Sequence, residues 1–328
     1  MTKDTVFAIL KNEGATVSGE RISGRLGVSR AAVNAAIKAL REDGYDIESA
    51  TNRGYLLRGG PEKLNAGELL ARLGEERMRR VVFLDTVDST NTYLRSLALS
   101  GAPEGQIAVA GRQTGGRGRL GRAFASPEGM GVYLSALLRP DCRPEEVSAV
   151  TGCTAVAMAD AVQNACGVRP GVKWVNDLLL DGKKIAGILT ELSVEGESGS
   201  VQYVIVGVGV NCNQLAGDFP GELAGMAGSV RMHTGEAVCR ADLAAEMIAA
   251  FDVLAEAYPA GRADYLAAYR QDCVTPGNTV TVRRGEQERE AFAEGIGEDF
   301  GLRVRYAGGG RETLSGGEVS VRGLLGYV

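Results

Sequence analysis

Apolar positions in the first 60 residues recur at the spacing of short helices. Residues 5–10 form one amphipathic stretch, and Val33, Ile37 and Leu40 recur at i, i+4 and i+7 along a later one. Ser29 stands where the N-cap of that later helix is expected, and a glycine-containing turn just before it follows a shorter helical stretch. The pattern predicts a helix-turn-helix.

Two apolar stretches that follow are typical of a β-hairpin. Residues 45–48 and 54–57 flank a turn around 51–54, and such a hairpin would make the helical unit winged. Polar side chains on the second helix and in the turn suit DNA, because Arg and Lys bond guanine edges or phosphates and Asn bonds adenine. The predicted DNA contacts are Ser29, Arg30, Asn34, Lys38 and Arg53. The alternative is a three-helix packing module with a solvated charged face.

A cluster of polar residues follows the next strand-like segment. Residues 81–84 predict a strand and residues 92–99 a helix, with Ser89, Thr90 and Asn91 between them. One such side chain is enough to cap a helix, whereas three stand here. The cluster therefore serves either as a plain cap or as a binding surface for a ligand.

A loop at residues 113–124 alternates glycine with arginine. Residues 116–121 match G-x-G-x-x-G, but no strand directly precedes them and turn sequence follows, so a dinucleotide site is disfavoured. A P-loop is excluded, because G-x-x-x-x-G-K-[ST] does not occur. Arg117, Arg119 and Arg122 could instead fold their guanidinium groups over a polyanion. A surface Arg/Gly turn or an RNA-binding tract is the alternative.

The stretch from 171 to 192 predicts a hairpin around the turn Asp181-Gly182, with its second strand near residues 184–192. It carries two ammonium groups, an amide and a carboxylate, from Lys173, Lys184, Asn176 and Asp177. Such a set suits a nucleoside triphosphate with Mg²⁺, although a purely structural hairpin would have the same apolar pattern. A strand at 204–210 follows, whose glycines permit close backbone approach, and Asn211 ends it.

The last third of the chain changes from helical to strand-like spacing. Two amphipathic helices are expected at 241–257 and 263–271. Short strands, mostly with period two, are expected after them at 279–283, 291–296, 302–306 and 318–322.

Composition limits the classes of protein. The 328 residues suggest two or three domains, and a chain with 45% apolar and 23% charged residues folds. Residues 1–60 carry a net charge of +2 and the rest −7, so nucleic acid would meet the N-terminal end. The six scattered cysteines and the absence of a signal core or membrane-length apolar run favour the cytoplasm. A single histidine, His233, disfavours two-histidine zinc sites and catalytic triads.

These motifs together resemble the biotin protein ligase family. The resemblance rests on the Gly-Arg loop, the Lys-Trp-x-Asn-Asp segment read as a strand, Lys184 with its Ile-Ala-Gly-Ile-Leu sequence, and Val-Gly-Val-Gly-Val-Asn, in that order. The winged helix in front makes the chain similar to the bifunctional members, which also repress the biotin operon. The resemblance covers essentially the whole chain.

The resemblance implies an α+β chain of three domains. A winged helix-turn-helix is expected at 1–60, an α/β ligase domain with a mixed sheet at 61–272, and an SH3-like β-barrel at 273–328. It also implies formation of biotinyl-5′-AMP from biotin, ATP and Mg²⁺, and transfer of biotin to a lysine of a biotin carboxyl carrier protein. The adenylate would act as corepressor at operator DNA of biotin genes, with homodimerisation and without a membrane.

Site roles follow from the same resemblance. Arg117, Arg119 and Lys184 would be catalytic. Biotin would contact Ser89, Thr90, Asn91, Gln113, Gly115, Gly116, Arg117, Gly118, Arg119, Lys184 and Gly187. The adenylate would contact Arg119, Arg122, Phe124, Asn176, Asn211 and Arg322, with Asp177 as the Mg²⁺ ligand and residues 213–233 closing over adenine. Two alternatives are a ligand-sensing regulator without ligase activity and a lipoate-type ligase.

Overall fold

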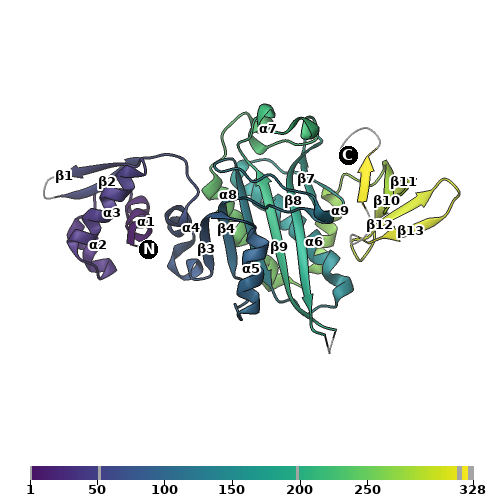
Figure 1. Cartoon of the computed structure of the whole chain (residues 1–328), viewed down its shortest axis with the longest axis horizontal. Coiled ribbons are helices and arrows are strands. Elements are labelled where there is room, and N and C mark those ends of the chain that lie inside the picture. The colour runs from purple at the N-terminus through teal and green to yellow at the C-terminus, as the bar shows by residue number, and fades with distance from the viewer. Residues whose placement is uncertain (1, 51–52, 197–198, 316–319, 324–328) are drawn as a thin grey trace. The chain divides into compact units, whose positions relative to one another are not determined.

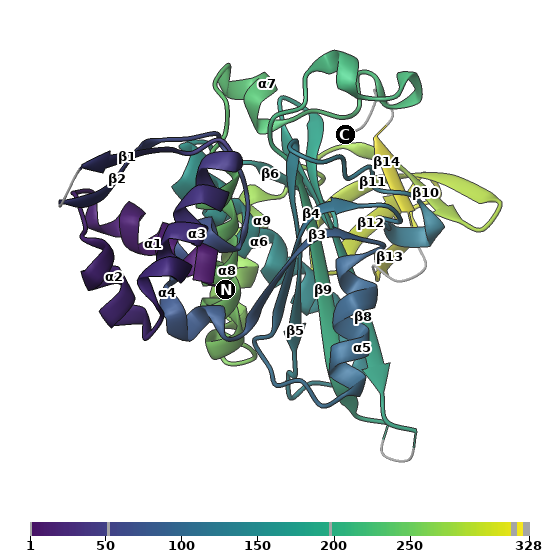
Figure 2. The same ribbon diagram turned by 60° about the vertical axis from the view of Figure 1, so that its left-hand side comes forward.

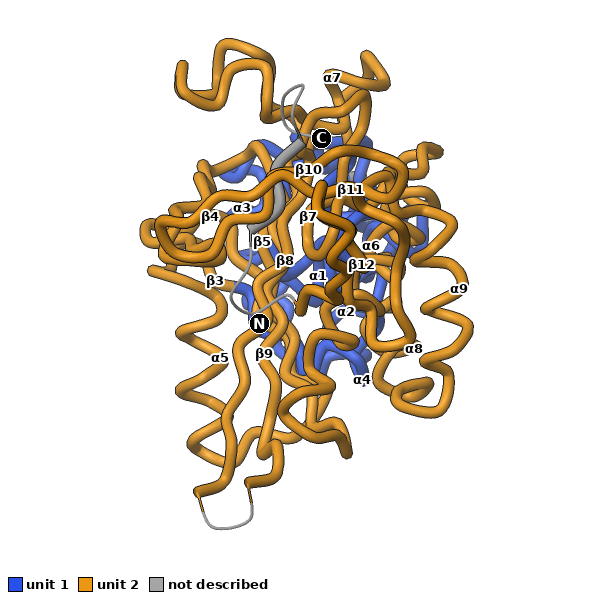
Figure 3. The backbone as a smooth tube through the Cα atoms, turned by 90° about the vertical axis from the view of Figure 1, so that its right-hand side faces the viewer, with its two compact units in different colours: residues 1–83, 239–245 blue, residues 84–238, 246–328 orange. Residues whose placement is uncertain are grey.

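The structure is a computed structural model that describes residues 2–50, 53–196, 199–315 and 320–323 (Figure 1). The chain divides into two compact units. One comprises residues 1–83 with 239–245, and the other residues 84–238 with 246–328 (Figure 3). No helix in the described ranges has the length and apolar character that crossing a membrane requires. The three-domain division remains a prediction.

The first unit contains the expected winged helix-turn-helix. Its elements are α1 (Thr2–Glu13), α2 (Gly19–Leu26), α3 (Arg30–Glu42), β1 (Asp46–Ala50), β2 (Gly54–Gly59) and α4 (Ala66–Met78). Apolar side chains from the first three helices and the hairpin, among them Phe7, Ile22 and Ile37, form its core. Ser29 caps α3 by accepting a hydrogen bond from the Ala32 amide at 3.2 Å. Figure 2 shows β1 and β2 beside these helices.

A glycine sets the position of the wing. Gly54 has φ +121°, and a Cβ there would lie 2.0 Å from the Val17 carbonyl oxygen. The next residue, Tyr55, exchanges two backbone hydrogen bonds of 2.9 Å with Val17. The hairpin is therefore attached to the segment before α2, and only glycine allows that close approach.

Strands from residues 81–211 form a seven-stranded sheet. Its order is β3-β4-β5-β9-β8-β7-β6. The strands are β3 (Val81–Val87), β4 (Ile107–Gln113), β5 (Gly131–Leu138), β6 (Gly171–Lys173), β7 (Asp177–Leu180), β8 (Lys183–Val194) and β9 (Val201–Asn211). In this order, each strand from β4 through to β6 at the far edge pairs antiparallel with its neighbour. β3 reaches β4 through a helical crossover, as the mixed sheet predicted from the sequence requires.

Helices cover this sheet. Those that contact it are α5 (Thr90–Leu99), α6 (Val147–Cys166) and α9 (Arg262–Asp272). The other helices of this part of the chain are α7 (Val230–Thr234) and α8 (Arg240–Ala257). Helix α5 packs on β4, β5 and β9, burying Leu94 and Ala98 against Leu137 and Ile205. Helix α6 packs on β8 and α9. The first turn of α5 is thereby placed over the middle of the sheet.

The C-terminal residues form a five-stranded antiparallel sheet in the order β13-β12-β11-β10-β14. The strands are β10 (Thr279–Arg284), β11 (Gln287–Ile296), β12 (Leu302–Tyr306), β13 (Arg311–Leu314) and β14 (Ser320–Gly323). Strand β13 was missed from the sequence. An antiparallel sheet is what the structure describes here, and closure into an SH3-like barrel remains a prediction.

One expected strand is wrong. Residues 174–176 form a turn between β6 and β7, because their polar groups bond outside the sheet ladder. The Trp174 amide donates to Thr275 Oγ1 at 2.9 Å, and its indole Nε1 donates to the Phe300 carbonyl at 2.8 Å. The turn directs Asn176 toward β8, where its Nδ2 donates to the Ile188 carbonyl at 2.9 Å.

Candidate functional site

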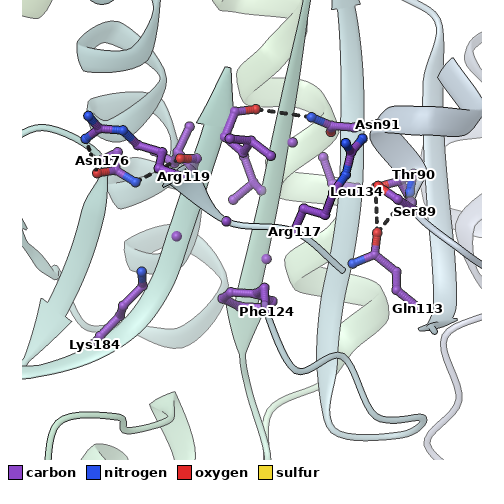
Figure 4. A pocket seen from close by; sticks show the side chains of 17 residues that line it. Ser89, Thr90, Asn91, Gln113, Arg117, Arg119, Phe124, Leu134, Asn176 and Lys184 are labelled. Atoms are coloured by element: carbon purple, nitrogen blue, oxygen red, sulfur yellow. Dashed lines mark hydrogen bonds between the residues drawn. The ribbon is translucent and has the colours of Figure 1, made fainter. Parts of the chain in front are cut away.

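A pocket in the second unit gathers most of the predicted ligand-binding residues. They come from the start of α5, the Gly-Arg loop, the turn before β7, and strands β8 and β9 (Figure 4). Its lining includes Ser89, Thr90, Asn91, Gln113, Arg117, Gly118, Arg119, Phe124, Asn176, Lys184 and Gly187. Five segments spread over residues 89–209 therefore meet at one place.

The start of α5 is built for more than capping. Ser89 occupies the N-cap position, yet its side chain makes no capping hydrogen bond. The Thr90 amide and hydroxyl instead meet Gln113 Oε1, at 2.9 and 3.1 Å. Gln113 Nε2 donates onward to Ser126 Oγ at 2.9 Å. Ser89 is therefore buried at the wall of the pocket, and its hydroxyl does not cap the helix.

The Gly-Arg loop folds back on itself. The Phe124 amide donates to the Gly116 carbonyl at 2.9 Å, and the Gly118 amide donates to the Arg122 carbonyl at 2.7 Å. A Cβ on Gly116 would lie 2.4 Å from the Phe124 carbonyl oxygen, so this strand-like return needs glycine. The loop passes one wall of the pocket and presents Arg117 and Arg119 on it (Figure 4).

Arg119 and Lys184 bring positive charge to the side formed by the turn before β7. Arg119 Nη1 donates to Asn176 Oδ1 at 3.1 Å, and Lys184 Nζ lies 2.6 Å from Asp177 Oδ1. Burial lowers the pKa of the Arg119 guanidinium, while the carboxylate of Asp177 opposes that shift. A guanidinium stays protonated under such conditions, so an anion entering here meets a poorly hydrated, fixed cation.

Two glycines of β9 form part of the pocket floor. A Cβ on Gly207 would lie 2.1 Å from Asn91 Oδ1, and one on Gly209 would lie 2.4 Å from the Phe124 ring. Their bare backbone lets Asn91 and Phe124 rest on the sheet. This is the close approach that the alternating glycines predicted.

Asn211 and the following loop lie next to Lys184. The backbone of Lys184 exchanges hydrogen bonds with Met226 and Gly228, at 2.8 and 2.9 Å. Asn211 is buried, and its Nδ2 donates to the Gly228 carbonyl at 3.0 Å. Residues 213–233 are thus attached to the strand that carries Lys184. Asn211 itself does not line the pocket.

The remaining predicted residues lie outside the pocket lining. They are Gly115, Gly116, Arg122 and Asp177. Arg122 is exposed, and Asp177 pairs with Lys184. The backbone of Arg322 lies in β14, but its side chain falls outside the described residues. Among the described residues, no cluster of three His, Cys, Asp or Glu side chains could hold a metal.

Two side chains that hydrogen-bond to the predicted pocket residues were not predicted from the sequence. Ser135 of β5 is fully buried, with its Oγ 2.6 Å from both Thr90 Oγ1 and Asn91 Oδ1. Glu191 of β8 accepts from Asn91 Nδ2 at 2.8 Å and from Arg95 Nη2 at 2.6 Å. A polar residue in the otherwise apolar run 132–138 was the available signal for Ser135. Glu191 had none, since its partners are distant in sequence.

The predicted DNA-binding residues share the exposed side of α3 and the wing. Ser29, Arg30, Asn34, Lys38 and Arg53 are all exposed. The hydroxyl of Tyr55 in the wing donates to Asn34 Oδ1. Arg41 differs, because it donates to the Ile47 carbonyl and to Ser49 Oγ, each at 2.6 Å, and so holds β1 to α3.

Sequence comparisons divide the chain as its motifs do. Residues 2–56 match an HTH domain family, and residues 83–211 match the biotin/lipoate A/B protein ligase family. The chain is 38% identical over 253 residues to the bifunctional ligase/repressor BirA of Bacillus subtilis, covering 77% of each chain. It is 35% identical over 206 residues to BirA of Escherichia coli, covering 63% of this chain and 62% of that one.

A solved structure supports the same relationship. The biotin protein ligase from Aquifex aeolicus, in complex with biotin and ATP, aligns with a TM-score of 0.64 and 27% identity. The alignment covers 75% of this chain and 99% of that one.

Proposed function

The chain belongs to the family of bifunctional biotin ligase/repressors, and on that basis we propose that it joins biotin to the AMP of ATP and transfers biotin to a carrier protein lysine. The same adenylate makes the first unit a repressor at DNA of biotin genes. The observation that carries this proposal is that the α5 hydroxyls, the Gly-Arg loop and Lys184 line one pocket.

The chemistry needs charge and position, with no side-chain nucleophile. In the first step the biotin carboxylate attacks the α-phosphorus of ATP, and pyrophosphate leaves. Both reactants are anions, so Arg117, Arg119 and Lys184 offset their repulsion and stabilise the charge of the transition state. In the second step the acceptor amine attacks the biotinyl carbonyl, and AMP leaves. A chain with one histidine can perform both steps.

The biotin side of the pocket comprises the start of α5 and the glycine floor. Ser89, Thr90, Asn91, Gln113, Gly187 and the loop from Gly115 to Arg119 would surround biotin. Two observations support this assignment. The Ser89 side chain makes no capping hydrogen bond, and hydrogen bonds fix the orientations of Thr90 and Gln113. The polar ring of biotin needs donors and acceptors that are already oriented.

The nucleotide side lies toward Lys184. Arg119, Arg122, Phe124, Asn176, Asn211 and Arg322 would contact the adenylate, with residues 213–233 covering adenine. Asp177 is the candidate Mg²⁺ ligand. One carboxylate is compatible with this ion, which commonly uses one or two carboxylates with substrate phosphates, and when bound it would neutralise phosphate charge.

Repression would require two copies of the winged helix-turn-helix. Ser29, Arg30, Asn34, Lys38 and Arg53 would contact the operator, and adenylate binding would favour a homodimer that spans paired half-sites.

A transfer assay tests the ligase. The full chain is incubated with biotin, ATP, Mg²⁺ and a biotin carboxyl carrier domain, and the product is read by mass spectrometry. We expect one biotin on one lysine, and no product when that lysine is replaced by arginine. A tenfold excess of lipoic acid should leave the yield unchanged. Lipoylation in preference to biotinylation, or no modified carrier, would reject the proposal.

A further inference from the structure

Glu191 brings together three side chains from two elements that form the biotin side of the pocket. It lies on β8 two residues beyond Leu189 and four beyond Gly187, so it belongs to the strand face that lines the pocket. Its Oε2 accepts from Asn91 Nδ2 at 2.8 Å. Its Oε1 accepts from Arg95 at 2.6 Å and lies 3.7 Å from Arg117 Nη2.

These contacts use both N–H donors of the Asn91 amide and one acceptor site of its oxygen. Its Nδ2 donates to Glu191 and, at 3.4 Å, to the Leu189 carbonyl. Its Oδ1 lies 2.6 Å from Ser135 Oγ, and because an amide oxygen only accepts, the Ser135 hydroxyl donates to it. Asn91 therefore connects Glu191 to Ser135 and, through it, to Thr90.

The far end of this network reaches the opposite end of the Gly-Arg loop. The Thr90 amide donates to Gln113 Oε1 at 2.9 Å, Gln113 Nε2 donates to Ser126 Oγ, and Ser126 Oγ donates to the Phe124 carbonyl at 3.1 Å. At the near end, Arg117 Nη2 donates to Thr92 Oγ1 at 3.0 Å beside Glu191. One chain of side chains thus holds the loop at Arg117 and at Phe124.

We propose that Glu191 is a positioning residue for biotin, a role that rests on the proposed function. Its carboxylate fixes the donor and acceptor directions of Asn91 and, through Ser135, of Thr90, and it holds Arg117 at the pocket wall. Glu191 does not line the pocket and so acts through these residues. Its charge also separates two guanidinium groups, those of Arg95 and Arg117, which would otherwise repel each other.

Biotin affinity measured without ATP tests the proposal. Isothermal titration calorimetry is run on the full chain as wild type, Glu191→Gln and Glu191→Ala, with Glu290→Gln, an exposed glutamate of β11, as control. Glutamine keeps an acceptor for one partner but cannot hold Asn91 Nδ2 and both guanidinium groups together. We expect biotin Kd to rise at least tenfold in Glu191→Gln, more in Glu191→Ala, and to stay at the wild-type value in Glu290→Gln.

Two further measurements separate positioning from mere stability. In steady-state adenylation, Glu191→Gln should raise KM for biotin while kcat stays within about twofold of wild type. In a double-mutant cycle, Glu191→Gln should cost less biotin affinity on an Arg117→Ala background than on the wild type. If Glu191→Ala fails to fold, Glu191→Gln alone carries the test.

The outcomes distinguish the role of Glu191 from the proposed ligase function on which it rests. Wild-type protein that does not bind biotin overturns the proposed function. Wild-type binding with unchanged Kd in folded Glu191→Gln overturns the role of Glu191 alone. Additive effects in the cycle, or a fall in kcat without a change in KM, would overturn it as well.

Discussion

Lys184 Nζ lies 2.6 Å from a carboxylate oxygen of Asp177, and this ion pair fixes the position of the lysine ammonium group. The pair lies where β7 and β8 meet, and the Lys184 backbone also holds residues 213–233. A lysine fixed in this way reaches the reacting phosphate and carboxylate without reorganisation.

Removal of that cation should abolish most of the chemistry. We expect Lys184→Met to slow formation of biotinyl-AMP by about 10²–10³-fold, the usual effect of deleting one preorganised electrostatic group. Pyrophosphate release with saturating biotin and ATP measures the rate. Lys183→Met, one residue earlier on β8, is the matched control and should retain the wild-type rate. Equal rates in the two variants would contradict the role of Lys184.

The glycine floor should tolerate no side chain. A Cβ at position 207 would lie 2.1 Å from Asn91 Oδ1, so Gly207→Ala must displace Asn91 from the pocket wall. We expect at least a tenfold loss of biotin affinity by calorimetry. Gly196→Ala, where a Cβ meets nothing within 4 Å, should bind biotin normally. Wild-type affinity in Gly207→Ala would show that Asn91 is not needed in its present place.

How far the sequence predicted this site depended on how local each signal was. The turn at Asp181 and Gly182 was predicted because both residues accept positive φ, and their φ values are +49° and +70°. The strand expected over residues 174–176 failed, because Trp174 bonds to Thr275 and Phe300, more than a hundred residues away. Glu191 was missed for the same reason. Local turn and cap chemistry is readable in the sequence, whereas a side chain used by distant partners is not.

Two of the basic side chains on α3, Lys38 and Arg41, should behave differently. Lys38 is exposed and lies 3.8 Å from Glu42 of the same helix, whereas Arg41 donates hydrogen bonds to the wing. Lys38→Ala should weaken operator binding, reduce the slope of log K against log salt by about one, and leave the melting temperature unchanged. Arg41→Ala should lower the melting temperature of the first unit. Fluorescence anisotropy and thermal unfolding check both, and an unaltered salt slope in Lys38→Ala would exclude a phosphate contact.

Alkali should destabilise the second unit through a buried thiol. Burial raises the pKa of Cys153 from 9.0 to about 12. Between these values the unfolded chain loses a proton that the folded chain keeps, so the free energy of unfolding falls as pH rises from about 9 to 12. Urea unfolding across this range should give a shallower fall for Cys153→Ala than for wild type. Identical pH profiles would show that the thiol does not contribute.

Direct detection of the intermediate tests the central claim most sharply. The full chain is mixed with biotin, Mg²⁺ and ATP labelled on the α-phosphate, without carrier protein, and the labelled species that stays bound is identified by chromatography. We predict one biotinyl-AMP per chain, discharged as AMP when carrier is added. Arg119→Ala should release the same compound faster than wild type. Labelled ATP that remains unchanged in the presence of biotin, with wild-type protein, would contradict the account.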